Sequence, residues 1–167
     1  MKRIGLVGFS GSGKSSVVET AGKRGFKTAD TDRSIRSEFG DEPFEMISFG
    51  DEDPFRKIES EVIRKILETD TQLIAFGGGF HYLHKAFPAV ESAGVKLVYL
   101  KASIDELSDR FGDRPLFKKL GMEGYRELFN ERRPLYEKCA DFTVDTADRP
   151  VNEIWFEVER IWNLISL

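Results

Sequence analysis

Cysteine and histidine are scarce in this sequence, and no long hydrophobic run occurs. Its 167 residues include one cysteine, Cys139, and two histidines, His81 and His84. These numbers exclude an internal disulfide and a cysteine-rich metal site, and we interpret the histidines as surface or packing residues. Apolar runs such as 97–100 fall far short of the roughly 20 residues that a membrane helix needs. We therefore expect a cytoplasmic protein without a membrane segment.

Positive charge is also in deficit. Lys and Arg number 25 against 29 Asp and Glu, which gives a formal net charge of −4 and argues against nonspecific nucleic-acid binding. Hydrophobic residues make up 40% of the chain, enough for an ordinary core and too many for a disordered protein. Because no repeat, low-complexity tract or linker interrupts the sequence, we expect one domain over residues 1–167.

Short apolar runs alternate with longer stretches of helical spacing. The runs predict strands at 4–7, 26–29, 73–76, 95–100 and 142–144. Helical patterns follow Pro54 and Pro150, and Pro150 is expected at a first helical position. The alternation predicts an α/β fold, a doubly wound sheet of about five parallel strands with helices on both faces. Ligands of such folds bind beyond the carboxyl ends of the strands.

The segment from Gly8 to Ser15, GFSGSGKS, matches the phosphate-binding pattern G-x-x-x-x-G-K-[ST] between a predicted strand and a predicted helix. Its glycines allow consecutive N–H groups to face phosphate oxygens, and the helix N-terminus adds partial positive charge. In this motif Lys14 bridges the β- and γ-phosphates and the Ser15 hydroxyl ligates Mg²⁺. The motif indicates a P-loop NTPase-type fold and does not by itself separate a kinase from an ATPase or GTPase.

Two carboxylates follow the second predicted strand, in Asp30-Thr31-Asp32. An extended segment would project both to the same side. One carboxylate could hold the water shell of the metal while the other accepts a proton from an attacking hydroxyl. A polar turn with a helix cap explains the same residues equally well.

Arg56 and the run Gly77 to Gly79 are further candidates. Arg56 lies off the apolar stripe of its predicted helix, where Glu59 one turn later can orient it; a solvated helix face is the alternative. The three glycines directly follow the strand predicted at 73–76. They indicate that something approaches the backbone closely, and a tight turn is the alternative.

Arginines recur in the second half of the chain. The stretch 111–121, rich in Gly and charged residues, is the best candidate for a mobile loop. Arg110, at the end of the preceding helical stretch, and Arg114 within the loop could clamp adenine and the transferring phosphate as the loop closes. Arg132 and Arg133 precede Pro134-Leu135-Tyr136 and offer bidentate pairing to a carboxylate. Ordinary surface arginines are the alternative at each position.

In order and spacing these segments resemble the shikimate kinase family, small P-loop kinases related to nucleoside monophosphate kinases. The resemblance runs from Ile4 to about Pro150. Besides the motifs above, it rests on Phe55-Arg56 with Glu59, Arg114-Pro115-Leu116 and Val144-Asp145-Thr146. It implies ATP-dependent phosphorylation of the 3-hydroxyl of shikimate, a step of aromatic amino-acid biosynthesis, by an enzyme that uses Mg²⁺. We expect a monomer that binds these small molecules, without nucleic acid or membrane.

The resemblance also implies a role for each matched residue. ATP-binding residues would be Gly11, Ser12, Gly13, Lys14, Ser15, Ser16, Arg110, which stacks on adenine, and Pro150 near the adenine loop. Shikimate-binding residues would be Asp32, Arg56, Gly77, Gly78, Gly79 and Arg132, with the two arginines on the carboxylate. Mg²⁺ would be held by Ser15 and, through water, by Asp30. The catalytic residues would be Lys14, the base Asp32 and the lid residue Arg114.

Two features depart from the family pattern. Only three residues separate Arg110 from Arg114, so the lid at about 111–121 is short, and Phe80-His81-Tyr82 is bulkier than the small residues expected there. Alternatives are therefore a related kinase for another hydroxy acid such as gluconate, or a kinase-like nucleotide-binding protein without turnover. Because five basic residues should converge on two anionic substrates, we expect a locally cationic pocket.

Overall fold

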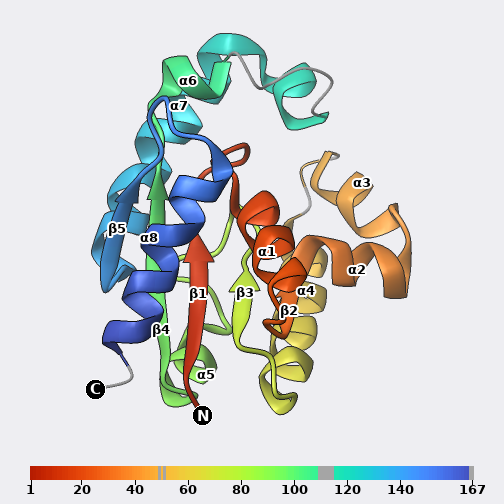
Figure 1. The fold of residues 1–167 in the computed structure, drawn as a ribbon. Helices are drawn as coiled ribbons and strands as arrows, with labels where there is room; N and C mark the ends of the chain where they lie inside the picture. Colours follow the sequence, from red (N-terminus) through yellow and green to blue (C-terminus); the bar gives the residue numbers. More distant parts are fainter. Residues whose placement is uncertain (49, 51, 109–114, 166–167) are drawn as a thin grey trace.

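The computed structural model describes residues 1–48, 50, 52–108 and 115–165, which form five strands and eight helices (Figure 1). The strands are β1 (Arg3–Val7), β2 (Thr28–Asp30), β3 (Leu73–Ala75), β4 (Val95–Lys101) and β5 (Phe142–Asp145). They form one parallel sheet in the order β2-β3-β1-β4-β5. The prediction of an α/β fold around five parallel strands is confirmed.

Helices cover both faces of this sheet (Figure 1). One face is covered by α1 (Lys14–Lys23) and α8 (Val151–Leu164). The other is covered by α4 (Glu52–Glu68), α5 (Phe87–Ser92) and α7 (Pro115–Cys139). The remaining helices are α2 (Thr31–Phe39) and α3 (Glu42–Ser48), which follow β2, and α6 (Ile104–Ser108), which precedes α7.

The alternation of side chains along the strands divides the core into two layers. In β4, Val98 and Leu100 belong to the cluster with α1 and α8, which also contains the buried Trp155. Leu97 and Tyr99 belong to the cluster on the opposite face. Because successive strand residues point to opposite faces, an apolar run without alternation predicts a strand that is buried on both sides.

The stretch 111–121 differs from its prediction as a mobile loop. Helix α7 begins at Pro115, and Gly121 interrupts it with a φ of 66° and a ψ of −178°. The loop prediction is therefore wrong for 115–120, while 111–114 lie outside the described residues. Glycine adopts this positive φ without the penalty that a Cβ imposes.

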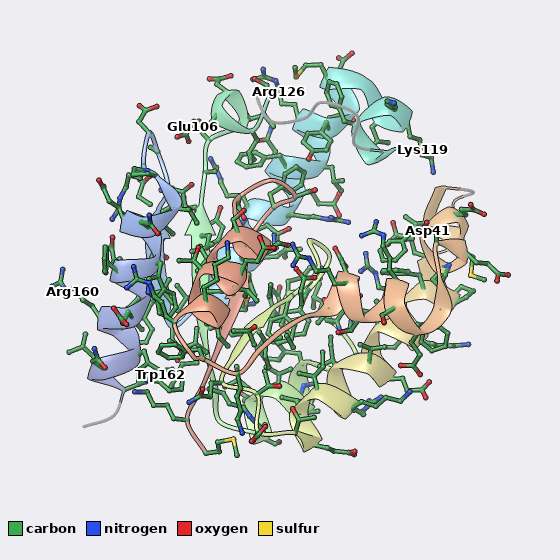
Figure 2. All side chains as sticks on the ribbon, turned by 45° about the vertical axis from the view of Figure 1, so that its right-hand side comes forward. Asp41, Glu106, Lys119, Arg126, Arg160 and Trp162 are labelled. Carbon is green, nitrogen blue, oxygen red and sulfur yellow. The ribbon has the colours of Figure 1, made fainter. Side chains whose placement is uncertain are left out.

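Charged side chains lie around the periphery of the molecule. Figure 2 shows Asp41, Lys119, Arg126 and Arg160 pointing away from the sheet, and all four are exposed. Among the described helices, none is both long enough and apolar enough to span a bilayer.

Candidate active site

The loop between β1 and α1 lines a cavity of about 380 Å³. Gly8, Gly11 and Gly13 have φ values of 147°, 92° and 96°, which side chains rarely permit. No described side chain caps the first turn of α1, so its N-terminus is oriented for an anion. The predicted nucleotide-binding residues of this segment all line the cavity: Gly11, Ser12, Gly13, Lys14, Ser15 and Ser16.

The side chain of Lys14 is buried against this loop. Its Nζ donates hydrogen bonds to the carbonyl oxygens of Gly8 at 2.6 Å and Phe9 at 2.9 Å. The hydroxyl of Tyr125 on α7 donates to the carbonyl of Ser10 at 3.3 Å and supports the loop from outside. The ammonium group is thus held beside the backbone that this motif uses to bind phosphate.

Asp30 and Asp32 both line the same cavity, although the geometry expected of them is wrong. Asp30 is extended, with φ −127° and ψ 118°, but Thr31 and Asp32 already belong to α2. The helix-cap interpretation is confirmed, because Asp30 Oδ1 accepts a hydrogen bond from the backbone N–H of Arg33 at 3.1 Å. Its other oxygen, Oδ2, accepts from Ser15 Oγ at 2.6 Å. One aspartate therefore caps a helix and faces the phosphate loop.

Ser15 and Asp30 present oxygen ligands of the kind that Mg²⁺ prefers. This ion commonly binds one or two carboxylates together with substrate phosphates and water. Within the described part of the chain, no group of three or more His, Cys, Asp and Glu could hold a metal by itself. The donor set fits a Mg²⁺ ion that arrives with nucleotide phosphates.

Asp32 has the properties of a general base. Its pKa is raised to about 6, mainly by burial and further by Glu59 and Asp30, against opposing effects of Lys14 and Arg36. A carboxylate with a pKa near neutrality can accept a proton efficiently at physiological pH. The electrostatic surroundings therefore suit the predicted role of Asp32.

A second cavity of about 340 Å³ adjoins the first at the triple glycine. Gly78 lines the first cavity, whereas Gly79 lines the second together with Arg56 and Arg132. The second lining carries three basic and three acidic side chains: Arg56, Lys85, Arg132, Glu52, Asp53 and Glu131. Among the described residues it has no excess of positive charge. Our expectation of a cationic pocket also counted Arg110 and Arg114, which lie outside the described residues, and it stays a prediction.

The triple glycine is approached closely by side chains of the chain itself. A Cβ at Gly79 would overlap the guanidinium group of Arg56. A Cβ at Gly77 would lie 2.7 Å from Glu59 Oε1 and 2.8 Å from Asp32 Oδ1. The predicted close approach to the backbone is confirmed. The tight turn is present as well, because the N–H of Phe80 donates to the carbonyl of Gly77 at 2.9 Å.

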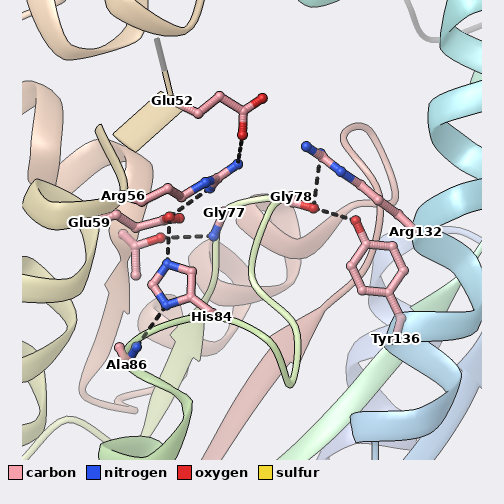
Figure 3. A network of polar contacts seen from close by, with 10 residues as sticks. Glu52, Arg56, Glu59, Gly77, Gly78, His84, Ala86, Arg132 and Tyr136 are labelled. Atoms are coloured by element: carbon pink, nitrogen blue, oxygen red, sulfur yellow. Dashed lines mark hydrogen bonds and ion pairs between the residues drawn. The ribbon is translucent and has the colours of Figure 1, made fainter. Parts of the chain in front are cut away.

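Hydrogen bonds fix the same segment from both sides (Figure 3). The carbonyl of Gly78 accepts from Arg132 Nη1 at 3.2 Å and from the hydroxyl of Tyr136, both on α7. On the other side, the N–H of Gly77 donates to Thr31 Oγ1 at 2.9 Å. The triple glycine is therefore attached both to α7 and to the first residue of α2, which lies between the two aspartates.

Arg56 on α4 is held by two carboxylates. Its Nη1 donates to Glu59 Oε2 at 2.7 Å and its Nη2 to Glu52 Oε2 at 3.2 Å. Burial works against the charge of Arg56, but Glu59 and Glu52 outweigh it and raise the pKa. Since this side chain is only 18% exposed, the solvated-face interpretation is wrong and the predicted orientation by Glu59 is confirmed.

The two histidines belong to this site, which the sequence analysis did not predict. His84 is buried, and its Nε2 lies 2.8 Å from Glu59 Oε2. His81 lines the second cavity, and burial together with Arg132 lowers its pKa to about 4. Our interpretation of His84 as a surface or packing residue missed its polar partner, because no sequence spacing relates it to Glu59.

Of the three residues expected near adenine and the transferring phosphate, the structure describes only Pro150. Arg110 and Arg114 lie outside the described residues. Pro150 is the N-cap of α8, one position earlier than expected, and its neighbours Arg149 and Val151 line the first cavity. The sequence analysis assigned Arg149 no role.

Comparison with known proteins agrees with this geometry. The pattern of the family described as shikimate kinase matches residues 10–162. The shikimate kinase of Thermodesulfovibrio yellowstonii is 37% identical over 99% of this chain and 98% of its own. The Aquifex aeolicus shikimate kinase structure has a TM-score of 0.78 at 27% identity, covering 99% of this chain and 98% of its own. The structure of the Acinetobacter baumannii shikimate kinase in complex with shikimate has a TM-score of 0.85 at 24% identity. It covers 100% of this chain and 96% of its own, which shows that the fold is shared. This chain belongs to the shikimate kinase family.

Proposed function

We propose that this chain transfers the γ-phosphoryl group of ATP to the 3-hydroxyl of shikimate, forming shikimate 3-phosphate and ADP for aromatic amino-acid biosynthesis. The observation that carries the proposal is that the adjacent residues Gly78 and Gly79 line two different cavities, the first of which is also lined by Asp32. One cavity contains a complete phosphate loop, and the other contains two arginines suited to a carboxylate. The family membership of the chain supports the same reaction.

The first cavity would bind the nucleotide. Backbone N–H groups of the loop and the N-terminus of α1 bind the phosphates, and Lys14 neutralises charge on the β- and γ-phosphates. Ser15 and Asp30 would hold Mg²⁺, which when bound neutralises further phosphate charge. Arg110 would stack on adenine near Pro150, and Arg114 would stabilise the transferring group; both roles rest on the resemblance.

The second cavity would bind the acceptor. Arg56 and Arg132 bind the shikimate carboxylate, while Asp32 and the backbone of Gly77 to Gly79 bind its hydroxyls. The 3-hydroxyl oxygen attacks the γ-phosphorus as its proton passes to Asp32, and the bond to the β,γ-bridging oxygen breaks. Since this transition state is loose, positioning and charge neutralisation provide most of the catalysis.

Residues far apart in the sequence line both cavities, which supports a single catalytic domain over residues 1–167. We propose that this domain works as a monomer in the cytoplasm. Light scattering at assay concentration tests the monomer. A molecular mass near 38 kDa, twice the 19.0 kDa of this chain, would contradict it.

The activity is tested by a coupled assay of ADP release with ATP, Mg²⁺ and one acceptor at a time. Shikimate should stimulate release strongly, whereas gluconate and quinate at the same millimolar concentration should not. Phosphorus NMR of the product should show a phosphate ester on the 3-hydroxyl. No stimulation by shikimate would overturn the proposal, and stimulation by gluconate alone would favour the related-kinase alternative.

A further inference from the structure

His84 is a buried polar residue to which the proposed reaction assigns no step. It lies between the triple glycine and α5, and its side chain is 2% exposed. Its ring packs beside Phe80, with ring centroids 5.1 Å apart. A polar group buried among apolar neighbours lowers stability unless its nitrogen atoms are hydrogen-bonded.

Both ring nitrogens of His84 have partners, and these partners define the tautomer. Nδ1 accepts a hydrogen bond from the backbone N–H of Ala86 at 3.0 Å, so it carries no proton. The ring proton must then be on Nε2, which donates to Glu59 Oε2 at 2.8 Å (Figure 3). His84 is therefore a hydrogen-bond donor with a fixed direction toward Glu59.

The two carboxylate oxygens of Glu59 differ in their hydrogen bonding. Oε2 accepts from both His84 and Arg56, whereas Oε1 has no hydrogen-bond partner among the described residues and lies beside Gly77. Burial alone would raise the pKa of Glu59, but the hydrogen bond from His84 and the charge of Arg56 lower it. Since its side chain is 0% exposed, water cannot readily replace either donor.

We propose that His84 is a positioning residue of the acceptor site: it fixes the Glu59 carboxylate, which in turn orients the Arg56 guanidinium over Gly79. This inference rests on the proposed function, in which Arg56 binds the substrate carboxylate. The guanidinium is packed so closely on Gly79 that a Cβ there would overlap it. A turn of the Glu59 carboxylate would therefore move Arg56 relative to the cavity.

Two substitutions of His84 distinguish the effect of its hydrogen-bond donor from the effect of its side-chain volume. His84→Phe keeps a planar ring beside Phe80 and removes the donor, whereas His84→Gln retains an N–H donor near the position of Nε2. We expect His84→Phe to raise KM for shikimate about ten-fold, as expected for a lost charge-assisted hydrogen bond. KM for ATP should not change, kcat should stay within about two-fold, and His84→Gln should restore most of the affinity. An unchanged KM in His84→Phe, or equal defects in both variants, would overturn the proposal.

A double-mutant cycle with Glu59→Gln tests whether His84 acts through Glu59. If it does, adding His84→Phe to Glu59→Gln should change KM for shikimate less than about two-fold, because the coupling is already lost. Independent effects that multiply would contradict the proposal. ADP affinity and thermal melting of each variant verify that the fold and the nucleotide site are intact.

A second readout does not depend on turnover. Nitrogen-15 NMR of the wild-type His84 ring at pH 7 should show the proton on Nε2, and its signal should shift in Glu59→Gln. A proton on Nδ1 would overturn the inference even in an active enzyme. If shikimate did not stimulate ADP release, the proposed function would fail, and this spectrum would still decide whether His84 holds Glu59.

Discussion

The two substrate sites are built in opposite ways. The phosphate site comes from one continuous segment, Gly8 to Ser16, and its ligands are largely backbone N–H groups at a helix N-terminus. The acceptor site combines side chains from α2, α4 and α7 with the loop after β3, linked by hydrogen bonds among themselves. One site depends on local backbone conformation, and the other depends on tertiary packing.

This difference predicts different responses to substitution. Side-chain changes leave backbone donors in place, so the phosphate site should lose function mainly through its one buried cation. The acceptor site should respond in graded steps, since each side chain supports a neighbour. The variants below test that contrast.

Lys14→Ala should have one of the two largest effects. Removing the one charged side chain of the phosphate loop should lower kcat by about 10²- to 10³-fold, as for other groups that stabilise transition-state charge. KM for shikimate should change less than about two-fold, because Lys14 does not line the acceptor cavity. Lys23→Ala, at the exposed opposite end of α1, is the matched control and should retain wild-type kinetics. If affinity for ATP and affinity for shikimate fell by similar factors in Lys14→Ala, the two sites would not act separately.

Asp32→Asn should lower kcat by about 10²- to 10⁴-fold, the usual contribution of a general base. ADP affinity, measured by calorimetry, should stay close to wild type because the phosphate loop is unchanged. In the wild type, kcat/KM for shikimate should rise with pH through about 6, where Asp32 loses its proton. Turnover near the wild-type rate in the variant would show that Asp32 is not the base.

The same substitution should stabilise the fold, in a pH-dependent way. The pKa of Asp32 is raised from 3.8 to about 6 in the folded protein, so the folded state binds this proton more tightly than the unfolded state. The contribution of Asp32 to wild-type stability therefore falls as pH rises from about 4 to 6, and it falls no further above that range. At pH 7.5 Asp32→Asn should be more stable by about 3 kcal/mol, with no difference near pH 3.5. Denaturant unfolding of both proteins at both pH values measures the difference in stability. If that difference did not change with pH, the raised pKa of Asp32 would not be its cause.

Arg132 and Arg133 are adjacent in sequence but lie in different surroundings. Arg132 bonds the Gly78 carbonyl and lines the acceptor cavity, whereas Arg133 is about half exposed and lies 4.0 Å from Glu137. Arg132→Ala should raise KM for shikimate about 10- to 100-fold, the loss expected for a hydrogen-bonded charge. Arg133→Ala should leave both KM values unchanged, because exposed ion pairs contribute little. If the two variants raised KM for shikimate equally, the contact of Arg132 with the acceptor cavity would not explain acceptor binding.

The same contrast explains what the sequence could predict. The phosphate-loop residues predicted to bind nucleotide all line one cavity, because the motif is local and its glycines report backbone conformation directly. Asp30 and Asp32 were assigned to the site, but their geometry was wrong because α2 begins at Thr31. Strand periodicity does not reveal how early a following helix starts.

Side-chain networks were the least predictable part. The ion pair of Arg56 with Glu59 was predicted because the residues lie one helical turn apart. The contact of Glu59 with His84 spans 25 positions and exists only because α4 packs against the loop after β3. Thr31 and Tyr136 reach the triple glycine in the same way. Such contacts follow from the packed fold and leave no spacing in the sequence.

The smallest effects are expected in the triple glycine. A Cβ at Gly79 would overlap the flexible end of Arg56, whereas a Cβ at Gly78 would meet its nearest atom, Ser10 N, at 3.4 Å. Neither glycine has a left-handed φ, so alanine suits both backbones. Gly79→Ala should therefore raise KM for shikimate about three- to ten-fold by displacing Arg56, and Gly78→Ala should change it less than about two-fold.

Steady-state kinetics for the two alanine variants separate crowding by side chains from substrate contact with the backbone. If glycine served only as a flexible turn, both variants would show the same small defect. A larger defect in Gly78→Ala would mean that the substrate itself needs the space above Gly78, where the two cavities meet. The expected order, with Gly79 more sensitive, would show that these glycines are required mainly because Arg56 must lie against the backbone to face the acceptor.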